Sequence, residues 1–141
     1  MRSGRTRSQP EPPPPIFFLD RGLGRITVAS ALRDAGFSAL PMTDVYPNGA
    51  DQRIGDDEWI GRASSEGWIA LTKDASIVRD HEVALLSSTL RVFALSNANL
   101  TGPEMAERYR VNINRIVQRA RRDGPYVYVV GPSGLDLRWR P

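Results

Sequence analysis

Acidic residues stand at three places beside short apolar stretches, far apart in the sequence. Asp20 follows the apolar run 16–19 directly, within FFLDRGLG. The triplet 56–58 opens a segment with helical spacing, and Asp74 comes two residues after the apolar run 68–72. If these runs are strands of one parallel sheet, the acids gather at the edge where the strands end. Converging carboxylates can bind a divalent cation, which activates water and stabilises charge on a phosphoryl oxygen.

The kind of metal follows from the residue types that are available. Neighbouring carboxylates repel one another, so a positive group is needed among them. The chain has no cysteine and a single histidine. Oxygen ligands without thiolates favour Mg²⁺ or Mn²⁺ over zinc. We therefore predict a Mg²⁺ or Mn²⁺ site among these acids.

Each acid also has a purely structural explanation. Asp20 can end its strand by bonding the backbone of the RGLG turn. An acid of the triplet 56–58 can cap the helix that follows, and Asp74 can cap the next segment. The convergence of all three places on one edge is the observation that favours the metal site.

Apolar runs alternate with helical segments along most of the chain. Short, continuously apolar runs are typical of strands covered on both faces, and the alternation indicates an α/β fold with a mostly parallel sheet. The expected strands are 16–19, 37–42, 68–72, 91–95 and 126–130, with a short antiparallel return at 135–140. The expected helices are 25–36, 56–67, 79–88 and 101–122, and 43–55 is expected to be a loop.

Local signals support several of these elements. Ile26, Ala29 and Leu32 are expected on one face of the first helix, which ends near Gly36. Pro41 cannot donate to a neighbouring strand, so the second strand is expected at a sheet edge.

The longest helix has the clearest beginning. Thr101 and Glu104 have the spacing of a capping box, with Pro103 in the first turn. An apolar stripe follows at helical spacing. It consists of Met105, Tyr109, Ile113, Ile116 and Ala120.

The bulk composition is that of one soluble domain. With 141 residues the chain can bury one core, and no stretch approaches the ~20 apolar residues of a membrane helix. Residues 1–15 carry three Arg, one Glu and five Pro and are expected to be a disordered tail before a domain at 16–141. The absence of cysteine excludes disulfides and thiol chemistry and fits a cytoplasmic protein. The net charge is +3 and Lys73 is the only lysine; this richness in Arg fits either phosphate recognition or a GC-rich genome.

Taken in order, four blocks of the sequence resemble a known family. FFLDRGLG, the helix end LRDAG, then DDEWI and GWIALTKD are similar to the PIN-like domains, in particular the VapC-type toxins of toxin–antitoxin pairs. The resemblance extends from 16 to 130. It implies a three-layer α/β/α sandwich, a Mg²⁺-dependent endoribonuclease activity on RNA, a cognate antitoxin that occupies the cleft, and often a homodimer.

The resemblance also implies roles for single residues. Asp20 matches the acid that ends the first strand, and Asp74 matches the aspartate of the T-x-D block. Asp56 and Glu58 match the two acids of D-x-E-W-I and compete for the second position, while Asp57 stays open. In this scheme Asp20, Asp56 and Asp74 hold Mg²⁺ directly or through water. Glu58 orients the attacking water or completes the metal shell.

Other charged residues near these acids leave alternatives open. The nearest candidates for a fourth acid of the family are Asp80 and Glu82. Whether the site holds one metal ion or two stays open, because the fourth acid is not assigned. Arg21 and Lys73 flank two of the acids and either contact the phosphate or balance local charge. For Lys73 we favour charge balance.

Basic and aromatic residues outside the acidic groups have mainly structural interpretations. On the long helix, a solvated basic face is favoured over one that guides an RNA backbone. His81 is interpreted as a surface residue near a helix start. Core packing is favoured over base stacking for Trp59 and Trp68. The basic face consists of Arg108, Arg115, Arg119 and Arg122, and the other aromatic residues expected to pack are Tyr126, Tyr128 and Trp139.

Two further functions compete with the metal-dependent ribonuclease. A catalytically weak PIN-like fold would act as a binding module for an antitoxin or for RNA. A receiver-like signalling domain also gathers aspartates and a lysine at this edge. TKD places Lys73 beside Asp74, however, and no acidic pair precedes the end of the first strand. The ribonuclease is therefore the favoured hypothesis.

Overall fold

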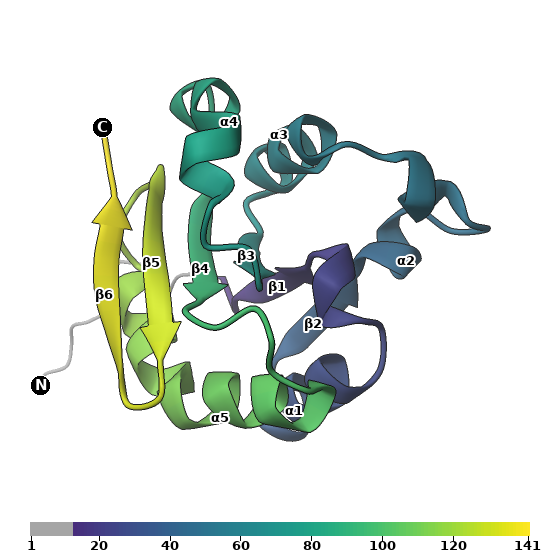
Figure 1. Cartoon of the computed structure of the whole chain (residues 1–141), viewed down its shortest axis with the longest axis vertical. Helices are drawn as coiled ribbons and strands as arrows, with labels where there is room; N and C mark the ends of the chain where they lie inside the picture. The colour runs from purple at the N-terminus through teal and green to yellow at the C-terminus, as the bar shows by residue number, and fades with distance from the viewer. Residues whose placement is uncertain (1–12) are drawn as a thin grey trace, which may run out of the picture.

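A computed structural model describes residues 13–141, so most of the tail expected at 1–15 lies outside the described residues. The described chain forms a six-stranded sheet in the order β2-β1-β3-β4-β5-β6, with helices on both faces (Figure 1). The predicted three-layer α/β/α fold with a mostly parallel sheet is confirmed.

The strands are short, as expected for strands buried on both faces. β1 to β5 pair in parallel with their neighbours, and β6 runs antiparallel to β5. The predicted antiparallel return is thereby confirmed. The strands are β1 (Ile16–Leu19), β2 (Ser38–Pro41), β3 (Ile69–Thr72), β4 (Arg91–Leu95), β5 (Tyr126–Gly131) and β6 (Gly134–Trp139).

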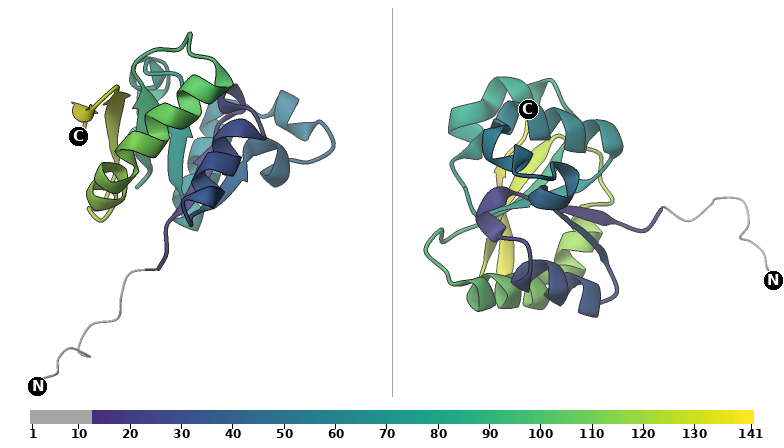
Figure 2. Two further views of the ribbon diagram at one scale, coloured as in Figure 1. Left: turned by 90° about the horizontal axis from the view of Figure 1, so that it is seen from below. Right: turned by 90° about the vertical axis from the view of Figure 1, so that its right-hand side faces the viewer.

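Helices cover the sheet from both sides and create two hydrophobic cores. One core lies between the sheet and the pair α1 and α5, and the other lies between the sheet and α3 with α4 (Figure 2). None of these helices is long and apolar enough to cross a membrane. The helices are α1 (Thr27–Asp34), α2 (Met42–Val45), α3 (Asp56–Glu66), α4 (Ile77–Leu86) and α5 (Gly102–Arg119), with short 3₁₀ helices η2 (Arg21–Leu23) and η3 (Ala50–Arg53).

The beginning of α5 and its buried tyrosine fix this helix on the sheet. The backbone N–H of Thr101 donates to Glu104 Oε1 at 2.8 Å, and the Glu104 N–H donates to Thr101 Oγ1 at 3.3 Å, which confirms the capping box. The fully buried Tyr109 hydroxyl lies 3.0 Å from the carbonyl oxygens of both Thr72 and Phe93. Tyr109 therefore holds α5 against the end of β3 and the middle of β4.

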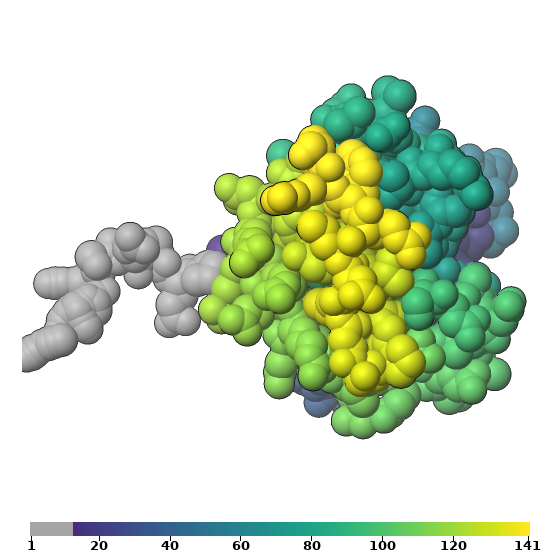
Figure 3. Space-filling model, turned by 60° about the vertical axis from the view of Figure 1, so that its left-hand side comes forward, coloured from purple at the N-terminus to yellow at the C-terminus, as the bar shows by residue number. Residues whose placement is uncertain are grey.

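Each edge of the sheet carries a feature that discourages further strand pairing. Pro41 ends β2 at one edge, as predicted. β6 forms the other edge and lies on the outer surface of the molecule (Figure 3). Its pairing with β5 is interrupted by a register shift at Val127 and Tyr128, and Asp136 and Arg138 are exposed along it. Charges and bulges of this kind protect an edge strand from aggregation.

Several details differ from the sequence predictions, among them the end of α5 at Arg119 instead of 122. The segment 43–55, expected to be a loop, contains the end of α2 and η3, because Met42 and Tyr46 are buried in the core beneath α3. Ile26 precedes α1 and is 63% exposed, and Val28 is buried on the helix face instead. The fourth helix begins at 77 and ends at 86 instead of spanning 79–88.

Trp59 and Trp68 pack in the core, as predicted. Trp59 is 1% exposed and Trp68 is 9% exposed. Their rings lie 5.3 Å and 5.9 Å from the ring of Phe18 on β1. The predicted packing of Tyr126 and Tyr128 is also confirmed, since both rings contact Phe93.

Candidate metal centre at the carboxyl edge of the sheet

Asp20 is held at the tip of β1 by bonds to the backbone and to β3. Its N–H donates to Leu71 O at 3.0 Å, which extends the β1–β3 pairing by one residue. One carboxylate oxygen, Oδ1, accepts from the Arg21 N–H at 2.6 Å, and Oδ2 accepts from the Thr72 hydroxyl at 2.8 Å. The end of β1 and the neighbouring strand β3 therefore fix the position of the Asp20 carboxylate.

The RGLG turn after Asp20 is built around a close contact. A Cβ atom on Gly22 would lie 2.8 Å from Lys73 Cε, so a larger residue here would force the lysine side chain to shift. Gly24 has φ 73°, a left-handed conformation that favours glycine. Lys73 thus packs on the turn that carries Asp20, in keeping with a structural role.

Burial and a second acid act on the ionisation of Asp20. Burial raises the pKa of Asp20 above its ordinary value, and the bond from Thr72 opposes this shift. The negative charge of Asp56 raises the pKa further. Asp20 and Asp56, 36 positions apart in sequence, therefore lie close enough for their charges to interact.

Asp74 is tied to the same threonine from the other side. The Thr72 hydroxyl, which donates to Asp20, accepts from the Asp74 N–H at 3.1 Å. Asp74 Oδ1 accepts from the Ser76 N–H at 2.9 Å and from the Ser76 hydroxyl at 2.5 Å. Ser76 Oγ also lies 3.3 Å from Asp80 Oδ2, which places Asp80, one of the two fourth-acid candidates, beside this group.

Asp56 is fixed by two ring nitrogens. The Trp59 indole N–H donates to Asp56 Oδ1 at 2.8 Å, and His81 Nε2 lies 2.9 Å from Asp56 Oδ2. The other ring nitrogen of His81 lies 2.9 Å from Asp57 Oδ1. His81 thus joins α4 to the first turn of α3, at a residue of α4 whose φ of −136° and ψ of 32° are not helical.

This arrangement corrects the interpretation of His81 as a surface residue near a helix start. Its side chain is only 25% exposed, and both ring nitrogens contact acids of the candidate site. Sequence reasoning missed this because 24 residues separate His81 from Asp57. A break in the apolar periodicity of 77–86 was the only available signal.

Glu58 lies in the first turn of α3, but its charge acts on Tyr46, whereas the charge of Asp56 acts on Asp20. Burial raises the pKa of the Tyr46 hydroxyl, and the negative charge of Glu58 raises it further. Of the two competing acids, Asp56 is therefore the one whose charge acts on Asp20.

The guanidinium of Arg21 bonds backbone carbonyls, and its positive charge partly offsets the rise that burial causes in the pKa of Asp20. The Arg21 guanidinium donates to Asp51 O and, at 3.0 Å, to Ile54 O. These bonds hold the segment between η3 and α3 against the RGLG turn. Arg21 thereby supports the position of α3, on which Asp56 lies.

The donor set suits a hard divalent cation. Asp20, Asp56 and Asp74 offer only carboxylate oxygens, and the mutual repulsion of Asp20 and Asp56 is the condition that a cation relieves. Within residues 13–141, no three His, Asp or Glu side chains lie close enough together to hold a metal ion. Mg²⁺ usually keeps several waters and binds only one or two carboxylates directly, so a loose group of acids fits this ion better than a closed cage.

Comparison with known proteins agrees with this fold. Residues 15–97 match the family described as "PIN like domain". The chain is 36% identical over 120 residues to a Mycobacterium tuberculosis protein named "Putative ribonuclease VapC45", an alignment that covers 84% of this chain and 87% of the relative. No solved structure matches the chain significantly. The chain belongs to the PIN-like domain family, among its VapC-type members.

Proposed function

We propose that this protein is a Mg²⁺-dependent endoribonuclease that hydrolyses RNA phosphodiester bonds and serves as the toxin of a type II toxin–antitoxin pair. The observation that carries the proposal is the hydroxyl of Thr72, which donates to Asp20 and accepts from the backbone of Asp74. The buried Thr72 joins the Asp20 carboxylate to the backbone that carries Asp74, which supports a common site for both acids at this edge of the sheet. The relative named as a ribonuclease supports the same function.

The proposed metal ligands are Asp20, Asp56 and Asp74, bound directly or through water. A bound Mg²⁺, or Mn²⁺, supplies a Lewis acid that activates water and stabilises charge on the phosphate. Glu58 is proposed to orient the attacking water or to complete the shell. Thr72 keeps Asp20 and the backbone of Asp74 in fixed relation, which reduces the reorganisation needed during the reaction.

Trp59 and His81 are proposed to orient the carboxylate of Asp56. A carboxylate has about four lone-pair positions, so the bonds from these two rings leave Asp56 able to accept further contacts. The Trp59 ring is buried in the core and the His81 ring also contacts Asp57, so the plane of the Asp56 carboxylate is fixed before substrate binds. Such support of a metal ligand is usually worth about 10- to 100-fold in metal affinity or activity.

The biological setting is inferred from the family. VapC-type members imply a cognate antitoxin and an RNA substrate, and we propose both partners for this chain. A homodimer and a cytoplasmic location complete this proposal.

A binding module without strong catalysis is the second candidate function. The observation in its favour is the absence, within residues 13–141, of three His, Asp or Glu side chains gathered to hold a metal ion. Under this alternative Asp20 is a turn residue and Asp56 serves only to anchor Trp59 and His81.

Cleavage of total cellular RNA by the purified protein decides between the two functions. The assay compares Mg²⁺, Mn²⁺ and EDTA, with Asp74→Asn as the test variant, because asparagine keeps the Oδ1 acceptor for Ser76. Asp136→Asn is the matched control, since Asp136 is exposed on β6. Discrete cuts that need metal and are lost only in Asp74→Asn support the nuclease. No cutting, together with no thermal shift on adding metal, overturns it.

A further inference from the structure

The amino ends of the strands, opposite the acids, carry a second group of charged residues. Arg91 begins β4, and Arg121 and Arg122 follow the C-terminal end of α5. We name these three residues the arginine platform. β4 pairs with β3 from Arg91 opposite Ile69 onward, so the platform and Asp74 lie at opposite ends of the strands, roughly 15 Å or more apart.

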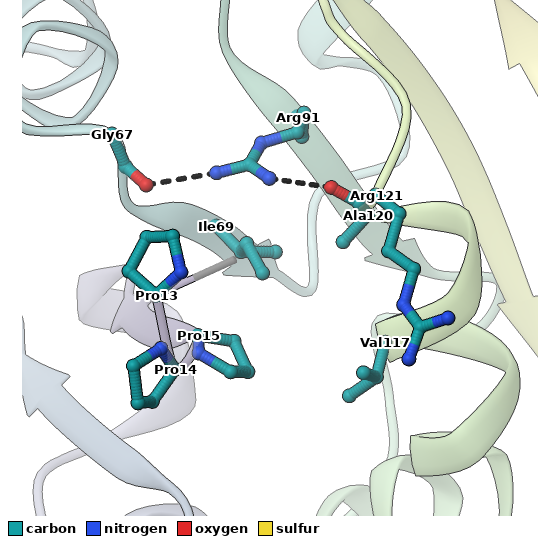
Figure 4. A pocket seen from close by; sticks show the side chains of 9 residues that line it. All are labelled: Pro13, Pro14, Pro15, Gly67, Ile69, Arg91, Val117, Ala120 and Arg121. Atoms are coloured by element: carbon teal, nitrogen blue, oxygen red, sulfur yellow. Dashed lines mark hydrogen bonds between the residues drawn. The ribbon is translucent and has the colours of Figure 1, made fainter. Parts of the chain in front are cut away.

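The turn that carries the platform is held rigidly. The Arg91 guanidinium donates to Ala120 O and, at 2.8 Å, to Gly67 O, and so joins the ends of α5 and α3 (Figure 4). The Tyr126 hydroxyl lies 2.7 Å from Arg119 O and 3.0 Å from Arg122 O. A Cβ atom on Gly124 would lie 2.4 Å from Thr89 O, so this turn packs directly on the chain before β4.

Two adjoining hollows are both lined by Arg91. The first, of about 610 Å³, has an apolar floor that includes Ile69 and Val117 and is bordered by Pro13–Pro15 and Arg121 (Figure 4). The second, of about 570 Å³, is polar and is shared by all three platform arginines. Ser64, Thr89 and one acid, Asp123, also line it.

The polar hollow offers donors beyond the arginines. Ser64 Oγ accepts from the Thr89 N–H at 2.9 Å and lies 3.2 Å from Thr89 Oγ1. Two hydroxyl hydrogens serve a single bond between these oxygens, so one hydroxyl hydrogen remains free to donate. Guanidinium groups with a hydroxyl donor form a set that suits phosphate oxygens.

A structural role accounts for Arg91 but not for its two neighbours. Arg91 neutralises the carbonyl ends of two helices, where a cation is favourable. With residues 13–141, the side chains of Arg121 and Arg122 form no hydrogen bond and no ion pair, although they stand on a fixed turn. Trp68 at this end is stacked on Phe18 and covered by the Arg62 guanidinium, so it is not available for base stacking. The surface is therefore suited to a phosphate backbone rather than to bases.

We propose that the arginine platform is a second RNA-binding surface, which holds the phosphate backbone of a folded RNA while another part of that RNA lies at the acidic edge. The inference rests on the proposed ribonuclease function for its choice of RNA. It commits the protein to a substrate large enough to contact both ends of the sheet. A short single strand that fills only the acidic edge does not contact the platform.

The test is the binding of two probes, bulk tRNA and a short oligouridylate, by Asp74→Asn protein with and without Arg121→Gln/Arg122→Gln. The double substitution should weaken tRNA binding about tenfold and lower the slope of log K against log salt by roughly 1.5, with oligouridylate binding unchanged. Arg110→Gln/Arg138→Gln is the matched control, because it removes the same charge from α5 and β6. Unchanged tRNA affinity and salt slope overturn the proposal.

The same variants separate this inference from the proposed function. In an otherwise wild-type protein, the double substitution should slow cleavage of folded RNA through KM and leave cleavage of short RNA unchanged. If the wild-type protein cuts no RNA but the platform still binds tRNA, the nuclease fails and the platform stands. If the double variant loses an antitoxin and keeps its tRNA affinity, the surface is a protein interface and the RNA assignment is overturned.

Discussion

The Nε2 atom of His81 lies 2.9 Å from Oδ2 of Asp56, and the same ring lies 2.9 Å from Asp57 through Nδ1. The only histidine of the chain thus joins α4 to the acidic first turn of α3. With Trp59 on the other oxygen of Asp56, this contact fixes an acid whose charge reaches Asp20. The candidate site is therefore a set of acids positioned by Trp59 on α3, Thr72 on β3 and His81 on α4.

Replacement of His81 should impair cleavage by releasing Asp56. His81→Ala is expected to raise the Mg²⁺ concentration for half-maximal cleavage by about 10- to 100-fold, and His81→Gln, which keeps one N–H donor, should recover part of the loss. The measurement is a Mg²⁺ titration of initial rate. Val83→Ala is the control, because Val83 lies on the same helix and is 79% exposed. A His81→Ala protein that needs less Mg²⁺ than the wild type shows that His81 competes with the metal instead of supporting its ligand.

Removal of the Thr72 hydroxyl should affect both stability and activity. Thr72→Val keeps the shape of the side chain but leaves Asp20 Oδ2 and the Asp74 N–H without their shared partner. The expected loss in free energy of unfolding is about 1–3 kcal/mol, and cleavage should fall in parallel. Urea denaturation and the RNA assay measure the two effects. Thr72→Ser keeps the hydroxyl and should retain most activity; equal losses in the two variants would assign the effect to packing.

Much of the fold could be predicted because its central strands are buried on both faces. IFFL, WIALT and YVYVV are continuous apolar runs that leave little choice of structure. The segment 43–55 was different, since α2 and η3 are single turns without periodicity. Their formation depends on the burial of Met42 and Tyr46 against other elements, which local sequence does not express.

The acids of the site were easier to predict than the residues that position them. Asp20 and Asp74 follow strands, so their common edge is a consequence of parallel order. Thr72 acts on Asp20 across 52 positions and His81 acts on Asp57 across 24, and no local pattern encodes such contacts. Ser76 had a local signal, because it follows Asp74 by two residues, the spacing of an Asx turn.

Replacement of Tyr109 should weaken the joint between α5 and the strands β3 and β4. Tyr109→Phe keeps the ring in the core and removes the hydroxyl that lies 3.0 Å from the Thr72 and Phe93 carbonyls. The free energy of unfolding should fall by about 1–2 kcal/mol, with KM for RNA little changed. Thermal or urea denaturation gives the first quantity. An unchanged stability would mean that water replaces the hydroxyl at these carbonyls.

Neutralisation of Asp20 should stabilise the metal-free protein while abolishing cleavage. Burial and the charge of Asp56 raise the pKa of Asp20 above the usual 3.8, so the folded state binds this proton more strongly than the unfolded state does. The protein therefore loses stability as pH rises from the pKa of Asp20 in the unfolded state through its raised pKa in the folded state. This loss in the free energy of unfolding persists at neutral pH. Asp20→Asn removes that cost and keeps an acceptor oxygen at the strand tip.

The measurement is the free energy of unfolding in EDTA as a function of pH, for the wild type, Asp20→Asn and the control Asp136→Asn. Asp20→Asn should exceed the wild type at pH 7, and the two curves should converge below pH 4 because the wild-type carboxyl is then protonated. Added Mg²⁺ should raise the stability of the wild type more than that of Asp20→Asn, since a bound cation stabilises only the folded state that holds it. A lower stability of Asp20→Asn than of the wild type at pH 7 in EDTA would contradict this prediction. It would mean that the two hydrogen bonds of the Asp20 carboxylate stabilise the turn by more than repulsion from Asp56 destabilises it.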